Sequence, residues 1–95
     1  METLHFDWDQ WNVQKNEIKH GISSLEAESV FFDPDLVIFR DIQHSRGEQR
    51  FVLYGLSKYH HILMVAFTLR EKKVRIISAR TASKKERGLY ENKRS

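Results

Sequence analysis

Residues 61–80 read HILMVAFTLREKKVRIISAR, and this stretch decides the fold. Ile62 to Phe67 is a near-continuous apolar run, which is typical of a central strand buried on both faces. After the short polar segment REKK, residues 74–80 show the alternation of a second strand. Because the turn between them is short, we predict two antiparallel neighbours over residues 61–70 and 74–80.

Further strands are predicted upstream of this pair. Residues 36–42 and 50–57 are apolar segments that flank the polar loop QHSRGEQ, in which Gly47 can adopt a positive φ. The N-terminal segment LHFDWD alternates apolar and polar side chains, which indicates a short, half-buried strand.

Two helices are predicted between the first strand and the others. The first spans residues 11–21, with Trp11 and Ile18 as its apolar positions and Gly21 at its end. The second begins at Ser23, whose hydroxyl can accept from the Glu26 amide while the Glu26 carboxylate reaches back, and it ends before Pro34. A third, C-terminal helix is predicted after Ser83, because Glu86 follows at the same spacing.

The predicted order defines an α+β fold. A short N-terminal strand and two helices pack on a mainly antiparallel sheet of four to five strands, and a C-terminal helix follows. The length of 95 residues is that of a single domain, which we assign to residues 1–95. We expect the helices to cover one face of the sheet, and the other face to be open wherever nothing else packs on it.

Composition excludes several classes of protein. The chain has no cysteine, which rules out disulfides and thiolate metal sites and favours a reducing cytoplasm. Its longest apolar run is too short to span a bilayer, and the N-terminus METLHFDWD lacks the features of a signal peptide. We therefore expect a cytoplasmic protein that does not enter the membrane.

Charge is distributed unevenly along the chain. Residues 1–69 carry six Lys/Arg and ten Asp/Glu, a balance of −4, whereas residues 70–95 carry ten and three, a balance of +7. This asymmetry predicts a surface that faces a polyanion, and the alternative is a solvated basic tail.

The strand at residues 74–80 leads into this basic region. Strict alternation places Val74, Ile76, Ser78 and Arg80 on one face, and Arg75, Ile77 and Ala79 on the other. Ser78 and Arg80 then form a polar patch beside the start of the last helix, and a guanidinium there suits a phosphate. The alternative is that Arg80 pairs with an acidic residue such as Asp41 and that Ser78 fills a small site.

Three other side chains have competing interpretations. His20 lies at a helix C-terminus, which favours its imidazolium form, so it could donate a proton or simply bond the last carbonyls. Glu86 could be a general base, although the helix cap accounts for it. Tyr90 could stack on a base or dock on the sheet.

Metal and cofactor sites are not indicated. His60 and His61 are adjacent on a strand and point to opposite faces, and His44 lies in the polar loop. No spacing of His, Asp and Glu resembles a zinc site, and no phosphate-binding glycine loop or nucleophile elbow is present.

Several motifs together resemble the BrnT family of type II toxins. FDWD, KHGIS, FFDP, GEQRF and RIISARTASKKERGLYE occur in the family's order over nearly the whole chain. The resemblance implies a RelE-like fold and a metal-independent endoribonuclease of the mRNA interferase type, which arrests translation. It also implies a BrnA-like ribbon-helix-helix antitoxin, a heterotetramer of two toxins and two antitoxins, and operator DNA binding by the complex.

RelE-like toxins depend on basic residues more than on a His/Glu pair, and the resemblance implies such a site here. The candidate catalytic residues are Arg80, Arg50, Ser78 and His20, and the candidate RNA-binding residues are Arg75, Lys84, Lys85, Arg87 and Tyr90. The alternative function is a non-catalytic module, or degenerate toxin, that binds nucleic acid or a partner.

Two positions depart from the family pattern. Gly88 lies inside the last helix, where glycine costs about 0.5–1 kcal/mol relative to alanine, so that helix is expected to be short or bent. Trp11 and Val13 are more apolar than the family's usual residues and suggest a contact surface.

Overall fold

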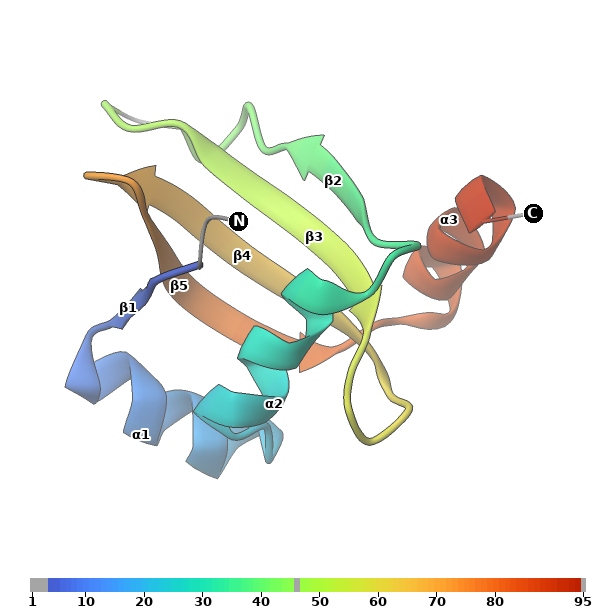
Figure 1. Cartoon of the computed structure of the whole chain (residues 1–95), viewed down its shortest axis with the longest axis horizontal. Helices are drawn as coiled ribbons and strands as arrows, with labels where there is room; N and C mark the ends of the chain where they lie inside the picture. Colours follow the sequence, from blue (N-terminus) through green and yellow to red (C-terminus); the bar gives the residue numbers. More distant parts are fainter. Residues whose placement is uncertain (1–3, 46, 95) are drawn as a thin grey trace.

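A five-stranded mixed sheet with helices at its margins forms the protein (Figure 1). The computed structural model describes residues 4–45 and 47–94. Along the chain the elements are β1 (Phe6–Trp8), α1 (Gln10–His20), α2 (Ser24–Ser29), the 3-10 helix η1 (Val30–Phe32), β2 (Val37–Arg40), β3 (Arg50–Leu56), β4 (Ile62–Arg70), β5 (Lys73–Thr81) and α3 (Lys84–Arg94). The predicted order of strands and helices is confirmed.

The strands lie side by side in the order β1-β5-β4-β3-β2. β2, β3, β4 and β5 form an antiparallel meander, as the short connections predict. β1 pairs parallel to β5, with Phe6 opposite Val74 and Trp8 opposite Ile76. The sheet is therefore mixed. Along the chain, helices α1 and α2 separate β1 from the antiparallel meander.

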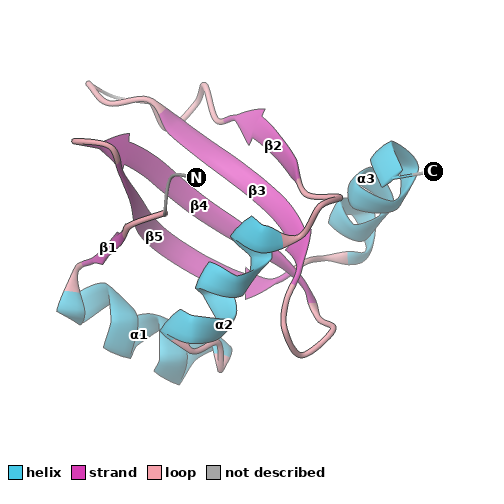
Figure 2. Ribbon diagram, in the orientation of Figure 1, coloured by secondary structure: helices cyan, strands magenta, loops and turns pink. Residues whose placement is uncertain are grey.

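One face of the sheet, which we call the helical face, packs against α2 and η1. Ala27 and Val30 from these helices are buried against Leu53, Val65 and other strand residues in the larger core cluster. Figure 2 shows α1 and α2 along one margin of the sheet. This core contains the apolar residues that the near-continuous run of β4 supplies.

Helix α1 does not use its predicted apolar positions for packing. Trp11 is 70% exposed and Ile18 is 87% exposed, so these two side chains do not contribute to the core. The buried residue is Asn16, whose Oδ1 accepts from the Ala79 amide at 2.8 Å while its Nδ2 donates to the Ile22 carbonyl at 3.4 Å. A polar side chain, satisfied by backbone groups, therefore attaches α1 to the end of β5.

The helix caps follow the predicted chemistry, with one difference. Gly21 ends α1 with a φ of 69°, and the Ser23 hydroxyl accepts from the Glu26 amide at 3.1 Å. We predicted that the Glu26 carboxylate reaches back to its cap, but it does not. It accepts instead from Ser57 Oγ at 2.7 Å and from His61 Nδ1 at 2.9 Å, so it holds the turn between β3 and β4.

Helix α3 packs on the opposite face of the sheet, which we call the α3 face. Tyr90 is 1% exposed and is buried with Val37 and Tyr54 in a second cluster. This face, which we predicted to be open wherever nothing else packs on it, is covered by α3 at one end. The helix runs without interruption through Gly88 from Lys84 to Arg94, so it is not shortened there.

A β-bulge in β5 changes which side chains share a face. Ala66 pairs with Ser78 and Phe67 pairs with Ile76, so Ile77 is an extra residue without its own partner. Strict alternation predicted Ser78 and Arg80 on the face of Val74 and Ile76, and this is wrong. The bulge moves Ser78 and Arg80 to the α3 face.

Candidate active site

Polar residues from three adjacent strands form a row across the α3 face. Arg50 of β3 lies opposite Thr68 of β4, and Thr68 lies opposite Arg75 of β5. Ser78 lies opposite Ala66 toward the end that α3 covers. The bulge therefore brings Arg50, Arg75 and Ser78, which the sequence analysis selected separately, onto one face.

Arg80 is on the same face but is fully engaged by α3. Its Nη1 donates to Glu86 Oε1 at 2.7 Å, and its Nη2 donates to Glu86 Oε2 at 2.9 Å. The hydrogen bonds from Arg80 lower the pKa of the Glu86 carboxyl to about 2, and the Ser83 amide contributes to this shift. Arg80 thus pairs with an acid, as the alternative interpretation proposed, but the acid is Glu86 and not Asp41.

Glu86 also completes the cap of α3. Its Oε1 accepts from the Ser83 amide at 2.8 Å, and the Ser83 hydroxyl accepts from the Glu86 amide at 3.2 Å, which is the predicted capping box. Tyr54 donates its hydroxyl to Glu86 Oε2 at 3.3 Å. A carboxylate with this many donors is held as an anion and is a poor general base.

Arg75 is also held by acidic side chains. Its Nη1 donates to Asp7 Oδ2 at 3.0 Å, and its Nη2 lies 3.9 Å from Asp9 Oδ2. Asp7 stands directly opposite Arg75 in the parallel pair of β1 and β5. These contacts place Arg75 at the rim of the row with its charge partly neutralised.

Arg50 differs from the other two arginines. Within the described residues its guanidinium makes no hydrogen bond, and its nearest acid is Asp41, whose Oδ2 lies 3.9 Å from Arg50 Nε. In the part of the chain that the structure describes, the Nε atom is buried without a partner, and so is the hydroxyl of Thr68, a residue that is 4% exposed. A cation whose donors are unused is the group best prepared to bind a phosphate oxygen.

Asp41 and His44, at the edge of this row, form a pair that the sequence analysis missed. His44 Nδ1 lies 2.9 Å and 3.0 Å from the two carboxylate oxygens of Asp41. The residues are three apart in a loop, where no periodicity indicates which side chains meet. The sequence signal available for this loop was the GEQRF motif, with which the loop ends.

His20 and Tyr90 do not have the properties expected of them. The pKa of His20 is lowered by partial burial and then by the neighbouring cations Lys19 and Arg80, so the imidazolium expected at this helix end is disfavoured. Tyr90 docks on the sheet and donates its hydroxyl to Asp33 Oδ2 at 2.7 Å. Because its ring is buried, Tyr90 cannot stack on a base, so it is no longer a candidate RNA-binding residue.

The first turns of α3 carry the predicted basic residues. Lys84, Lys85 and Arg87 are exposed at the end of the sheet where Arg80 lies. The strand spacing places the Cα atoms of Arg50 and Arg80 roughly 15 Å apart. The α3 face therefore offers separate cationic positions along its length, as a nucleic-acid backbone with several phosphates requires.

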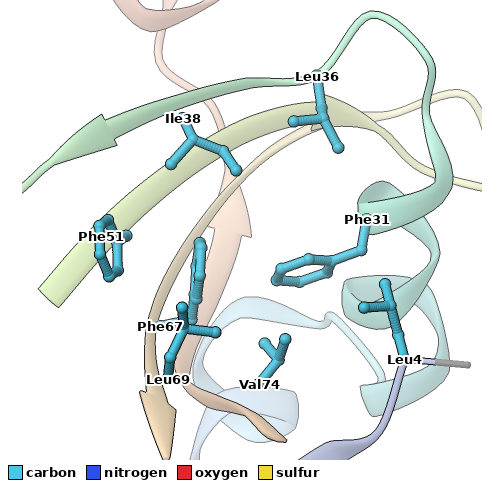
Figure 3. Close-up of a pocket in the computed structure, with 8 residues that line it drawn as sticks. All are labelled: Leu4, Phe31, Leu36, Ile38, Phe51, Phe67, Leu69 and Val74. Atoms are coloured by element: carbon cyan, nitrogen blue, oxygen red, sulfur yellow. The ribbon is translucent and has the colours of Figure 1, made fainter. Parts of the chain in front are cut away.

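The helical face contains a hollow of different chemistry. Its volume is about 320 Å³, and its lining consists of apolar residues from η1, four strands and the adjoining segments, as Figure 3 shows. Among them are Phe31, Phe51 and Phe67, which contact one another in edge-to-face and stacked pairs. None of the described residues that line this hollow is charged, and such a lining does not suit a phosphate.

The part of the chain that the structure describes offers neither a metal site nor a membrane-spanning helix. No group of three or more His, Asp and Glu side chains could hold a metal ion there. None of the helices described is long and apolar enough to cross a membrane.

The small α+β fold carries these arginines on one sheet face, and guanidinium groups suit phosphate oxygens. The family described as "Ribonuclease toxin, BrnT, of type II toxin-antitoxin system" matches residues 8–86, and the chain belongs to this family. The crystal structure of the Brucella abortus ribonuclease toxin BrnT is similar, with a TM-score of 0.64 and 25% sequence identity. The similarity covers 86% of this chain and all of that one. No curated protein sequence matches the chain.

Proposed function

We propose that this chain is the toxin of a type II toxin–antitoxin pair and cleaves RNA on the α3 face. Membership of a ribonuclease toxin family supports an endoribonuclease activity and an antitoxin partner. One observation supports the location of the site: the Arg50 guanidinium has no hydrogen bond within the described residues. Arg50 also lies opposite Thr68, whose hydroxyl has no partner within those residues either.

The reaction is attack of a ribose 2′-hydroxyl on the neighbouring phosphorus. Arg50 binds the phosphate and stabilises the charge that develops on its oxygens, a role that can be worth several kcal/mol. Ser78 adds a neutral hydrogen bond, and Arg75 holds the next part of the backbone. Lys84, Lys85 and Arg87 bind flanking phosphates through charge.

Arg80 has a double role in this proposal. In the free protein it fixes α3 to β5 through Glu86. It becomes a direct contact of the transition state only if a phosphate displaces that carboxylate. His20, with its lowered pKa, is a weaker candidate for the proton donor than at first expected.

The proposal extends to the type of ribonuclease activity, the antitoxin, the assembly and the regulation of the operon. We propose a RelE-like, metal-independent activity of the mRNA interferase type that arrests translation in the cytoplasm. We also propose a BrnA-like ribbon-helix-helix antitoxin that neutralises the toxin, a heterotetramer of two toxins and two antitoxins, and repression of the operon by operator DNA binding of the complex.

Induced expression followed by mapping of RNA 5′ ends tests the proposal. The wild type should arrest growth and generate new 5′ ends, whereas Arg50→Ala should generate far fewer. Arg40→Ala is the matched control, because Arg40 is an exposed strand arginine that pairs opposite Phe51 on the helical face. Growth arrest and new 5′ ends that persist in Arg50→Ala would contradict the assignment of the site.

One observation favours the alternative of a non-catalytic, degenerate toxin. Arg75 and Arg80 both lie in ion pairs, which is the normal state of structural arginines. A degenerate toxin would bind its antitoxin without arresting growth and would leave the transcriptome uncut. The same 5′-end mapping therefore separates the two functions.

A further inference from the structure

The Asp41 carboxylate joins an imidazole to the unbonded arginine of the proposed site. It lies 2.9–3.0 Å from His44 Nδ1 and 3.9 Å from Arg50 Nε. The side chain of His44 is 61% exposed, whereas that of Asp41 is 18% exposed. An accessible imidazole is thus held by a mostly buried anion, close to the guanidinium that would bind the phosphate.

The backbone around this group is held in place. The Asp41 amide donates to the Arg50 carbonyl at 2.8 Å, and the Arg50 amide donates to Ser45 Oγ at 2.9 Å. Ser45 Oγ in turn donates to the Asp41 carbonyl. These bonds close the base of the loop between β2 and β3, so the position of His44 relative to Arg50 is determined by the fold.

The contact with Asp41 also determines the tautomer of His44. A carboxylate only accepts hydrogen bonds, so Nδ1 must carry the hydrogen and donate it. In the neutral ring Nε2 then carries a free lone pair. A buried carboxylate that orients a histidine in this way is the arrangement that makes imidazole an effective proton acceptor.

We propose that His44 is the general base of the RNA-cleaving reaction and that Asp41 is its positioning residue. This inference rests on the proposed ribonuclease function. His44 Nε2 takes the proton of the 2′-hydroxyl while the 2′-oxygen forms its bond to phosphorus and Arg50 binds the phosphate oxygens. The bond from phosphorus to the 5′-oxygen breaks, and that oxygen keeps the electron pair and takes a proton from water. The products are a 2′,3′-cyclic phosphate and a 5′-hydroxyl, and the imidazolium returns its proton to solvent.

Other acid–base candidates are less suitable. Glu86 is held as an anion by Arg80, and partial burial together with the neighbouring cations lowers the pKa of His20. His61 has a comparable carboxylate partner in Glu26, but Glu26 belongs to α2, which packs on the helical face. Among these side chains, His44 alone shares its carboxylate with Arg50.

The test uses the purified full chain and a short oligonucleotide that contains one ribonucleotide, under single-turnover conditions. His44→Ala should slow cleavage by about 10²–10⁴-fold, the usual contribution of proton transfer. Added imidazole should restore part of the rate. Affinity for the all-2′-deoxy oligonucleotide, which cannot be cleaved, should change by less than about threefold, because a base acts on the reaction and not on the backbone charge. Asp41→Asn should likewise lower the rate without weakening that affinity.

His61→Ala is the matched control, because it removes another exposed histidine that is held by a carboxylate, here Glu26, and should leave the rate unchanged. A wild-type rate in His44→Ala would overturn the inference and leave the ribonuclease function intact. A slow His44→Ala variant that imidazole does not restore, and that loses affinity in parallel, would also overturn it. If the wild type cuts no oligonucleotide, the proposed function itself fails, and the inference fails with it.

Discussion

Arg80 and Glu86 form a two-point ion pair that joins the end of β5 to the first turn of α3, with nitrogen–oxygen distances of 2.7 and 2.9 Å. The Glu86 side chain in this ion pair is only 18% exposed, and the same carboxylate also caps its own helix. One carboxylate thus connects the capping box to the sheet.

Glu86 should make stability depend on acid pH. Its pKa falls from 4.5 to about 2 on folding, so between these values the unfolded chain binds more protons. The stabilisation is complete above about pH 4.5 and is lost as pH falls toward 2. After solvent screening we expect about 1–2 kcal/mol at pH 7. Urea unfolding should show Glu86→Gln less stable than the wild type by this amount at pH 7, with a smaller difference at pH 3. An equal difference at both values would contradict the prediction.

Arg50 and Arg80 should differ in what their loss affects. Arg50→Ala removes a side chain without a hydrogen bond in the described structure, so it should change the free energy of unfolding little while lowering the cleavage rate about 10²-fold or more. Arg80→Ala removes the cation that pairs with Glu86 and should cost about 1–3 kcal/mol of stability. Parallel urea unfolding and cleavage assays compare them. If only Arg50→Ala lost much stability, Arg50 would be the structural arginine, and the roles assigned to Arg50 and Arg80 would be reversed.

Features of this fold that depend on a single helical turn could be predicted from the sequence. Features that depend on how two strands pair could not. Ser83 and Glu86, or Gly21 at the end of α1, act within one helical turn, so their spacing reveals them. The bulge at Ile77 depends on the register between β4 and β5, which alternation in one strand does not contain. The family resemblance selected Arg50 and Ser78, but only the bulge places Ser78 on the face that carries Arg50.

The same limit explains the missed polar groups. Asn16 is itself polar, so hydrophobic periodicity does not mark it as buried, and its partners are backbone groups of Ala79 and Ile22. Asp41 and His44 meet through the path of a loop. Contacts of this kind follow from tertiary structure and leave no periodic trace in the sequence.

Asn16 should contribute strongly to stability. Asn16→Ala removes the acceptor of the buried Ala79 amide and should cost about 1–3 kcal/mol, because that donor is left unsatisfied. Thermal or urea unfolding measures the change. Gln14→Ala, on the exposed side of the same helix, is the control and should stay within about 0.5 kcal/mol of the wild type. Equal effects from both substitutions would show that Asn16 does not attach α1 to β5.

Two glycines should respond in opposite directions to alanine. A Cβ at Gly55 would lie 3.0 Å from the Val30 carbonyl oxygen and 3.1 Å from Val30 Cβ, so Gly55→Ala should force η1 away from β3 and cost about 1–3 kcal/mol. At Gly88 a Cβ meets nothing within 4 Å in the described structure. Since Gly88 lies inside α3, Gly88→Ala should raise the free energy of unfolding by about 0.5–1 kcal/mol.

Urea unfolding of the two glycine variants beside the wild type measures both changes in one experiment. Helix α3 positions Glu86 against Arg80, so the gain in Gly88→Ala should disappear when it is combined with a substitution that detaches the helix, such as Tyr90→Ala. A destabilised Gly88→Ala variant would mean that the backbone at Gly88 cannot accept a side chain in the helix. A neutral Gly55→Ala variant would mean that Val30 moves aside at no cost, and that the contact between η1 and β3 is looser than the 3.0 Å approach indicates.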